Sequence, residues 1–367
     1  MLKERTLKKI EKRFNKFVKK DGKIDNAYLL IHNDKRNVHI KLVEGTTGSE
    51  QAHPDQPYYI ANIQKTFIAT IIAMLEQQKK LSYEDTVVTY LDEALLEGIH
   101  IYKGFGYSKV IQIKHLLNHT SGINDFVEDE PKKAEPFIEK LLKDRNESFT
   151  KEDVILWSKE NLKAKFTPGD GFHYSDTGYL LLTLIIEKVT GRPYVEVLTE
   201  YILKRLNMKH TYMLHHSEPA EKNDYPIAPC YVRNVDMTQE NHLLFDDIIG
   251  RIFSTSEDLL IFMKALVNYE LLERDNLNKL TDWAKFPIGV DYGYGIVKTQ
   301  QVAGFIPDKY EAWGNVSLTG AFMFYHQQLE TYFIGSLNTE RYQQKSILLM
   351  NEMIDILYKE MKERKDS

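Results

Sequence analysis

The most informative stretch of this chain reads Tyr59-Ile60-Ala61-Asn62-Ile63-Gln64-Lys65-Thr66-Phe67. It runs into an apolar segment whose large residues are Phe67, Ile68, Ile71, Ile72 and Leu75. That spacing is typical of a helix that is buried on most of its surface. Asn62 and Lys65 stand three positions apart, so their side chains share one face of the first turn. The stretch therefore predicts a buried helix with a polar pair at its N-terminal end.

This polar pair resembles the nucleophile segment of an acyl-serine hydrolase, with asparagine in place of serine. In that chemistry a serine and a lysine share the same spacing, and the lysine takes the hydroxyl proton. Lys65 is present, but Asn62 carries an amide, which has no ionisable hydroxyl to attack with. We expect the scaffold of an enzyme whose nucleophile is missing.

Four more segments follow in a fixed order along the chain. They are Ile111-Gln112-Ile113-Lys114-His115-Leu116-Leu117-Asn118-His119-Thr120-Ser121-Gly122-Ile123, Pro168-Gly169-Asp170-Gly171-Phe172-His173-Tyr174-Ser175-Asp176-Thr177-Gly178-Tyr179, Ser254-Thr255-Ser256-Glu257-Asp258-Leu259 and Tyr292-Gly293-Tyr294-Gly295. They resemble the segments I-x-HLLxHTSGI, PGxxFxYSNxGY, STxEDL and YGxG of the serine β-lactamase and penicillin-binding-protein-like family. The likeness is to the class C β-lactamase and esterase-related branch in particular, and it extends from Tyr58 to Leu337.

The resemblance implies an α+β fold of the β-lactamase/transpeptidase-like type. Strand patterns at both ends of the chain agree with it: Ala27–His32, Asn37–Val43, Tyr292–Gln300, Ala321–His326 and Thr331–Leu337. We expect one antiparallel sheet, built from both termini and flanked by helices, with a mostly helical domain inserted. The predicted parts are a basic amphipathic helix at 1–22, a sheet domain with terminal helices at 23–65 and 286–367, and the helical domain at 66–285. Together they form one β-lactamase-related unit.

The resemblance also implies roles for two residues near position 175. Tyr174 would share a proton with Lys65 and with the leaving group, and a nearby cation lowers the pKa of a tyrosine. The alternative is a buried tyrosine that is satisfied by its neighbours. Asp176 stands where relatives carry an asparagine that holds a substrate amide. We expect Lys65 within hydrogen-bonding reach of Tyr174 and of the Asn62 side-chain oxygen, since a buried ammonium needs acceptors.

The third motif of the family is a His-x-Gly or Lys-Thr-Gly strand opposite the nucleophile, and it maps onto residues 314–322. Asn315 replaces the histidine or lysine, which removes a cation or proton donor from that wall. Ser317 replaces a glycine, so we expect its side chain to crowd the strand that a ligand approaches. Backbone N–H groups of Asn62 and Leu318 remain as candidate oxyanion donors. Arg251 replaces the second glycine of a Gly-Gly pair, and we place it in the pocket with Ser317.

Two other patterns compete as functional sites. Ser148-Phe149-Thr150-Lys151 is a literal Ser-x-x-Lys, but Thr150 with Asp153 is typical of a helix N-cap. His115 and His119 have the spacing of zinc ligands, but no glutamate follows the first histidine and no third ligand is indicated. We expect no metal and no cofactor.

The composition is that of an ordinary globular protein, with 43% hydrophobic and 28% charged residues over 367 positions. The net charge of −5 is uneven, because residues 3–20 hold nine Lys/Arg against two Glu (+7), which leaves −12 for the rest. A body of that charge is not expected to bind nucleic acid. Apolar residues recur at helical spacing in the basic segment: Leu7, Ile10, Phe14 and Phe17. This pattern predicts a terminal helix docked on the domain, with peripheral membrane contact as the alternative.

The single cysteine, Cys230, excludes an internal disulfide. The first residues have no apolar run between their charges, and no segment approaches about 18 uncharged apolar residues. We therefore expect neither a signal peptide nor a membrane span. The expected address is the cytoplasm, or the extracellular side if a leader had been removed.

Three functional hypotheses follow from these residues. The leading one is a catalytically degenerate protein that has lost acyl-serine chemistry and keeps a cleft for a small-molecule or peptide-like ligand, in binding or regulation. The alternative is a working hydrolase of an ester, amide or β-lactam in which Lys65 and Tyr174 activate water. The third is a structural or membrane-surface protein that uses its basic N-terminal helix.

Overall fold

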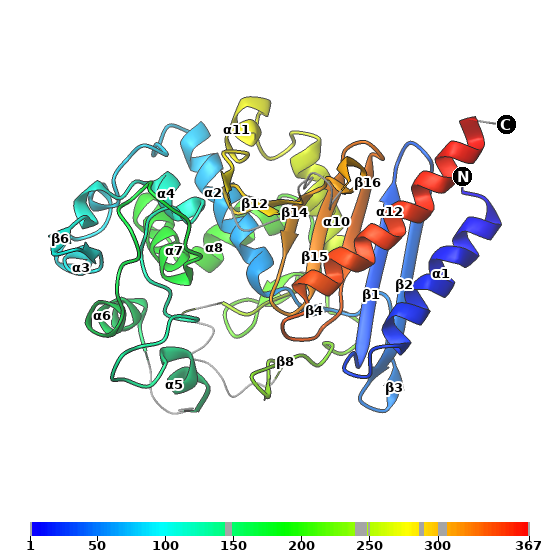
Figure 1. The fold of residues 1–367 in the computed structure, drawn as a ribbon, viewed down its shortest axis with the longest axis horizontal. Coiled ribbons are helices and arrows are strands. Elements are labelled where there is room, and N and C mark those ends of the chain that lie inside the picture. The colour runs from blue at the N-terminus through cyan, green and yellow to red at the C-terminus, as the bar shows by residue number, and fades with distance from the viewer. Residues whose placement is uncertain are drawn as a thin grey trace.

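A nine-stranded antiparallel sheet organises the molecule, and its strands come from opposite ends of the chain (Figure 1). The computed structural model describes residues 2–143, 149–238, 248, 250–285, 290–299 and 307–365. The strands follow the order β11 (Ala284–Lys285), β12 (Val290–Tyr292), β13 (Val297–Thr299), β14 (Trp313–Val316), β15 (Ala321–His326), β16 (Thr331–Ser336), β1 (Asn26–Asn33), β2 (Val38–Thr47) and β3 (Glu50–Gln51). The N-terminal hairpin joins the C-terminal strands where β1 pairs with β16, with Tyr28 opposite Ser336. The sheet built from both termini is thus as the sequence predicts.

Side chains alternate between two apolar cores along the central strands. On β1, Ala27, Leu29 and Ile31 pack into one core, whereas Tyr28 and Leu30 pack into the other. This alternation is the two-residue period of a strand that is covered on both faces. The terminal helices α1 (Glu4–Lys19) and α12 (Gln343–Lys365) cover the first face, and α10 (Ser256–Val267) lies on the second (Figure 1).

One predicted strand is a hairpin instead. The segment that the sequence pattern assigns to a single strand, Tyr292–Gln300, divides into the end of β12 and all of β13, and Gln300 lies outside the described residues. Gly295 turns the chain between them at φ +66°, and a Cβ there would lie 2.5 Å from the Ala69 Cβ. Only glycine fits a left-handed position that packs this closely on helix α2. The YGxG motif is therefore a turn against α2.

The basic N-terminal helix docks on the body of the protein along its full length. Ile10, Phe14 and Val18 are buried against the sheet and α12. The Arg13 side chain donates to Glu352 of α12, with 2.7 Å from Nε to the carboxylate. Of the predicted apolar face, Leu7 remains 39% exposed. The apolar side of α1 therefore belongs to the core of the protein.

The remaining helices belong to the same half of the molecule as α2 (Gln64–Gln77), whose residues 65–75 are all buried. They are α3 (Glu93–Leu96), α4 (Ile113–Leu117), α5 (Phe137–Lys143), α6 (Lys151–Asn161), α7 (Asp176–Thr190), α8 (Tyr194–Leu198) and α11 (Arg274–Lys279). Helix α2 packs directly on α7, α8 and α11. Three short strand pairings accompany them: β4 (Tyr58–Tyr59) with β10 (Ile252–Ser254) and β7 (Tyr212–Met213), β5 (Ile101–Tyr102) with β6 (Phe105–Gly106), and β8 (Tyr231–Val232) with β9 (Val235–Asp236). Burial of nearly every side chain explains why α2 has apolar residues on all faces.

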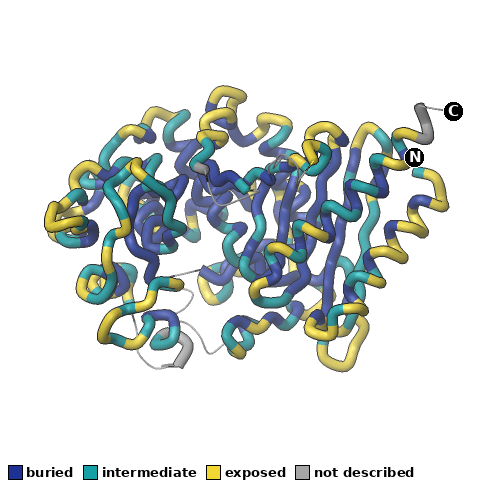
Figure 2. Tube along the Cα trace, in the orientation of Figure 1, coloured by how far each residue is buried: buried dark blue, intermediate teal, exposed yellow. Residues whose placement is uncertain are grey.

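Burial is deepest along α2 and the central strands, and exposure is concentrated on outer helices and loop tips (Figure 2). No helix in the described part of the chain is long and apolar enough to cross a bilayer. The domain limits at residues 22, 65 and 285 stay predictions, and residue 286 lies outside the described residues.

Candidate active site

Asn62 stands at the junction between a short strand and the central helix. Strand β4 ends at Tyr59, and the Ile60 N–H donates to the Ile252 carbonyl at 3.1 Å. A turn of 3-10 helix, Ala61–Ile63, then leads directly into α2. Ala61 has φ +43°, a left-handed conformation that costs a non-glycine residue about 1–2 kcal/mol. The chain thus carries local strain at the residue before Asn62, which is a recurrent property of functional sites.

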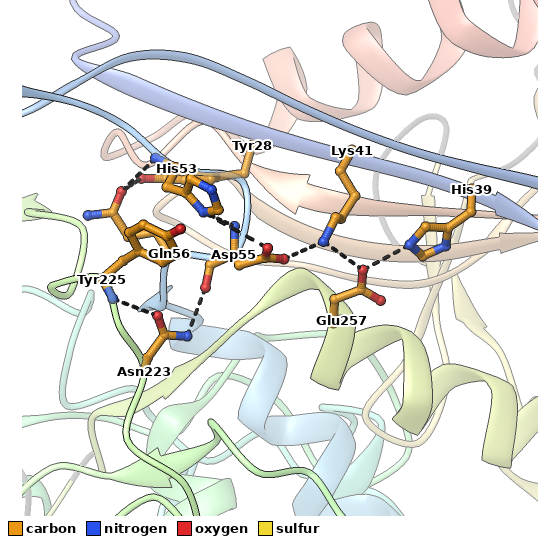
Figure 3. A network of polar contacts seen from close by, with 9 residues as sticks. All are labelled: Tyr28, His39, Lys41, His53, Asp55, Gln56, Asn223, Tyr225 and Glu257. Atoms are coloured by element: carbon orange, nitrogen blue, oxygen red, sulfur yellow. Dashed lines mark hydrogen bonds and ion pairs between the residues drawn. The ribbon is translucent and has the colours of Figure 1, made fainter.

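A polar network fixes the loop that precedes this junction (Figure 3). Lys41 of β2 forms ion pairs with Asp55 of the loop and with Glu257 at the start of α10, the latter at 3.2 Å. Gln56 accepts a hydrogen bond from the Tyr28 hydroxyl at 3.0 Å and donates to the Pro226 carbonyl at 2.8 Å. The loop is therefore tied to the sheet, to α10 and to the segment around residue 226. These contacts position the backbone that carries Asn62.

The Asn62 carboxamide is engaged at both ends. Its Nδ2 donates to the Tyr174 hydroxyl, and its Oδ1 accepts from the Leu318 N–H at 3.4 Å. Leu318 is one of the two backbone donors that the sequence assigns to an oxyanion hole. The side-chain oxygen of Asn62 therefore takes a position at which a bound carbonyl oxygen would meet that donor.

Lys65 pairs with a carboxylate. Its Nζ donates to Asp176 Oδ1, and the side chains of Lys65 and Asp176 are only 5% and 19% exposed. Burial, the largest single cause, lowers the pKa of Lys65, but Asp176 together with Tyr292 and Asp125 outweighs burial and the net shift of the pKa is upward. The expectation that Lys65 bonds to Tyr174 and to the Asn62 oxygen is therefore wrong. A buried ammonium takes the anionic acceptor, and its Nζ lies 5.0 Å from the centre of the Tyr174 ring.

Tyr174 is held in its protonated form. Burial and the nearby Asp176 carboxylate raise the pKa of Tyr174 well above its ordinary value. The expectation that the Lys65 cation lowers this pKa is wrong, because burial, the largest cause, and the Asp176 carboxylate both raise it. Since Asp176 neutralises the cation and adds its own negative charge, a phenolate at position 174 is disfavoured.

Two residues that the sequence reasoning did not assign to the site lie directly behind it. His119 is fully buried with its ring centre 4.3 Å from that of Tyr174, and its Nδ1 accepts from the Ser175 N–H at 3.1 Å. Asp125 accepts from the Asp176 N–H at 3.2 Å. Burial, with the neighbouring Asp176 carboxylate, raises the pKa of Asp125 well above its usual range. His119 lies inside the motif at residues 111–123, and Asp125 lies two residues beyond its end. Their closeness to this motif was the sequence signal that could have assigned them to the site.

The strand that faces Asn62 through the Leu318 N–H keeps its polar side chains inside the protein. Asn315 is buried, and its Nδ2 donates to Thr66 Oγ1 at 2.9 Å and to the Gly295 carbonyl at 3.0 Å. Ser317 has no exposed surface, and its Oγ shares a 2.8 Å hydrogen bond with Thr319 Oγ1. The expectation that Ser317 crowds an open strand is therefore wrong, because its hydroxyl caps the turn after β14.

Arg251 also does not line an accessible pocket, contrary to the sequence-based placement. It is fully buried, and its Nη1 donates to the Met237 carbonyl at 2.8 Å. A guanidinium inside the protein needs such acceptors because an unsatisfied buried charge is costly. The role of Arg251 is to join β10 to the segment around residue 237.

The competing patterns have structural roles where the structure describes them. Ser148 lies outside the described residues, and Thr150 caps α6 by accepting from the Asp153 N–H at 3.1 Å. His115 Nδ1 accepts from the Gln112 N–H at 3.2 Å, in a capping box at the start of α4. No group of three or more His, Cys, Asp or Glu among the described residues has the arrangement of a metal site.

A pocket of about 420 Å³ lies beside residues 62–65, and Gln64, which stands between Asn62 and Lys65 in the sequence, is part of its lining. Its lining includes Thr150 and Lys151 of α6, Glu187 of α7 and Tyr194 of α8. None of the site residues predicted from the sequence lines it. The geometry brings together Asn62, Lys65, Tyr174, Asp176 and the Leu318 N–H, and leaves Asn315, Ser317 and Arg251 buried outside the cleft.

Comparisons with known proteins agree with this geometry. The Beta-lactamase family model matches residues 8–344. Penicillin-binding protein 4* of Bacillus subtilis is 26% identical over 302 residues, which cover 78% of this chain and 62% of that protein. The Putative penicillin-binding protein PbpX of the same organism is 28% identical over 63% of this chain and 51% of its own length. The chain thus spans between half and two thirds of these relatives.

Solved structures share the fold over nearly the whole chain. D-amino acid amidase from Ochrobactrum anthropi has a TM-score of 0.76 at 20% identity, with 98% of this chain and 99% of that chain covered. A D-stereospecific amidohydrolase from Streptomyces has a TM-score of 0.73 at 24% identity, with 94% and 96% covered. The β-lactamase/transpeptidase-like α+β fold predicted from the motifs is confirmed.

Proposed function

Because the chain belongs to the β-lactamase family, we propose that it is a catalytically degenerate member, which has lost acyl-serine chemistry and keeps its cleft for binding or regulation. The observation that carries the proposal is the Asn62 carboxamide, bonded to the Tyr174 hydroxyl at one end and to the Leu318 N–H at the other. An amide nitrogen is delocalised and does not attack a carbonyl. The position of the nucleophile is thus occupied by a carboxamide that already forms hydrogen bonds with Tyr174 and Leu318.

The groups around Asn62 are also poorly suited to activate a nucleophile. The shifts in pKa keep Lys65 as an ammonium and Tyr174 as a phenol, so neither accepts a proton readily near neutral pH. Both shifts follow from geometry: burial is the largest cause of the raised pKa of Tyr174, and the Asp176 carboxylate raises the pKa of both residues. The proposal therefore rests on the missing hydroxyl and on the missing base together.

The opposite wall supports the same proposal independently. Asn315 replaces a cation or proton donor, and its amide is committed to Thr66 and Gly295 inside the protein. One substitution at Asn62 would not produce this second change. We infer that a ligand of this cleft is a small molecule or a peptide-like segment that is held without covalent attachment.

The alternative is a working hydrolase of an ester, amide or β-lactam. It is favoured by the retained pair Lys65 and Tyr174 and by the activities for which two structural neighbours are named, a D-amino acid amidase and a D-stereospecific amidohydrolase. In this alternative the two side chains activate water directly. That step requires Lys65 to lose its proton while it is paired with Asp176, which the ion pair opposes.

Turnover measurements on a set of variants separate the two proposals. The substrates are nitrocefin, an aryl ester and a D-amino acid amide, and the variants are Asn62→Ser, Asp176→Asn and the double variant. Wild type and Asp176→Asn, which lack a nucleophile, should match the buffer rate. Asn62→Ser should be slow, because Asp176 still holds Lys65 protonated. The double variant should exceed Asn62→Ser by on the order of 10²–10⁴-fold, the usual contribution of a general base.

Adding Asn315→His and Ser317→Gly to the double variant tests the strand wall, and a further gain is expected from the restored proton donor. Turnover by the wild-type chain of any of the three substrates contradicts the degenerate reading and supports the hydrolase. Ordinary family-like turnover by Asn62→Ser alone would show that the Lys65–Asp176 pair does not restrain the base.

A further inference from the structure

The basic helix α1 presents its charge entirely on the outside of the molecule. All nine Lys/Arg of residues 3–20 are exposed, whereas Thr6, Ile10, Phe14 and Val18 are buried. The helix lies along the outer edge of the fold beside α12 (Figure 1), and exposed positions recur along it (Figure 2). The apolar side is used by the core, so the outward side is available for electrostatic contact alone.

Part of this charge is already neutralised within the protein. Lys8 pairs with Glu4 at 2.7 Å, Arg13 with Glu352, and Lys19 with Glu44 at 3.4 Å. Four other lysines of the helix have no acidic partner among the described residues: Lys9, Lys12, Lys16 and Lys20. We call these four residues the lysine stripe.

The lysine stripe is a row on the outward side of the helix. At about 100° per residue, the four side chains fall within an arc of about 80°, whose centre lies about 140° around the helix from that of the buried residues. Lys20 keeps αR geometry as the C-cap, so it continues the row. From Lys9 to Lys20 the row spans roughly 16 Å along the helix. No apolar residue of α1 lies within this arc, because its apolar residues face or flank the core.

The lysine stripe has no apolar or aromatic neighbours, and this property favours some kinds of anionic partner over others. A protein interface needs an apolar centre, which the outward arc lacks. Nucleic acid is read by a helix that enters a groove or by aromatic rings that stack on bases. Here α1 is packed along its length against the body, and Phe14 faces the core. A planar anionic surface, by contrast, meets all four lysines at once without moving the helix.

We propose that the lysine stripe holds this protein on the surface of a bilayer rich in anionic phospholipid. The contact is electrostatic and peripheral, since the apolar face of α1 is occupied by the core. The rest of the chain carries a net charge of −12, so the α1 edge is the side that an anionic surface favours. The proposal does not depend on the function proposed for the cleft.

Vesicle co-sedimentation of the full chain tests the proposal. The vesicles contain either phosphatidylcholine alone or phosphatidylcholine with one third phosphatidylglycerol, each at low and at high salt. The test variant is Lys9→Gln/Lys12→Gln/Lys16→Gln/Lys20→Gln. The matched control is Lys80→Gln/Lys132→Gln/Lys133→Gln/Lys222→Gln, which removes the same charge from exposed positions elsewhere. Circular dichroism confirms that both variants keep the fold.

Wild type and control should sediment with anionic vesicles at low salt, and molar salt should release them because it screens the contact. Each lysine near an anionic surface contributes about fivefold in affinity, so the stripe variant should lose on the order of 10²–10³-fold. Equal binding by the stripe variant, equal binding to phosphatidylcholine alone, or no binding by wild type would each overturn the proposal. Tighter binding to duplex DNA than to the vesicles at equal phosphate concentration would also overturn it.

Discussion

The two walls of the cleft differ in where their side chains go. The helical wall (Lys65, Tyr174 and Asp176) directs ionisable groups toward Asn62 and toward one another. The strand wall (Asn315, Ser317 and Leu318) turns its polar side chains into the protein and offers only the Leu318 N–H. The helical wall thus keeps ionisable side chains close to Asn62, whereas the polar side chains of the strand wall form hydrogen bonds inside the protein.

Under the proposed function, this difference shows how a hydrolase scaffold can lose its chemistry without losing its fold. On the helical wall, Lys65 donates to the Asp176 carboxylate, at a position where the family resemblance implies asparagine. On the strand wall, the Asn315 side chain joins β14 to α2. Both side chains take part in hydrogen bonds within the protein, so both are expected to contribute to stability.

The largest effect is expected at the ion pair of the helical wall. Lys65→Met leaves the Asp176 carboxylate buried without its cation, and should lower the free energy of unfolding by about 3–5 kcal/mol. Lys65→Met/Asp176→Asn removes both charges and should be less destabilised than Lys65→Met alone. Urea unfolding of the four proteins of this cycle measures the effect. If Lys65→Met costs less than about 1 kcal/mol, the pair is solvated and the helical wall is not as described.

On the strand wall, removal of the Asn315 amide should lower the free energy of unfolding. Asn315→Ala breaks two buried hydrogen bonds to Thr66 and Gly295, and should lower the free energy of unfolding by about 1–3 kcal/mol. The exposed variant Asn278→Ala is the control and should stay within about 0.5 kcal/mol of wild type. A destabilisation no larger than the control's would mean that Asn315 is free to face the cleft.

Behind the helical wall, His119 should make stability depend on pH. Burial, with the charges of Lys65 and His173, holds the pKa of His119 well below its ordinary value. The unfolded chain protonates this histidine near pH 6.5 and the folded one does not, so stability present above pH 6.5 is lost as the pH falls below it. This histidine should contribute a slope of about 1.4 kcal/mol per pH unit between pH 6.5 and its folded pKa. His119→Asn, which suits φ +59°, should lose that part of the slope in urea unfolding at pH 5–8.

The smallest effect is expected at Ser317. Ser317→Ala removes the hydroxyl that bonds to Thr319 and accepts from the Ala321 N–H, and should cost roughly 0.5–1.5 kcal/mol. Because the side chain is buried in the turn, ligand access to the cleft should not change. A gain in turnover from adding Ser317→Ala to Asn62→Ser/Asp176→Asn, without loss of stability, would return Ser317 to the lining of the cleft.

Much of the fold follows from short-range pattern in the sequence. The apolar run after Thr66 predicts α2, and the alternating segments Ala27–His32 and Asn37–Val43 predict two strands, which in the structure are Asn26–Asn33 and Val38–Thr47. The break within 292–300 was missed because Gly295 turns the chain there, and a glycine in a strand pattern has more than one meaning. The order and the spacing of the five sequence motifs were sufficient to identify the family.

The hydrogen-bond and ion-pair partners within the site were not predictable from the sequence in the same way. Lys65 and Asp176 are 111 residues apart in sequence, and the choice among acceptors depends on how α7 docks on α2. The direction of Ser317 depends on β14 ending at Val316, one residue earlier, so that Ser317 begins a turn. Sequence patterns give residue types and faces, whereas hydrogen-bond partners depend on the packed register.

The most direct test of the central claim is intact-mass measurement of the wild-type chain after incubation with a fluorescent penicillin. A cleft without a nucleophile forms no acyl-enzyme, so the account predicts an unchanged mass and no fluorescent band under denaturing conditions. A penicilloyl mass increase that maps to any residue of the cleft would contradict the account, because it would show that acyl transfer survives without serine at position 62.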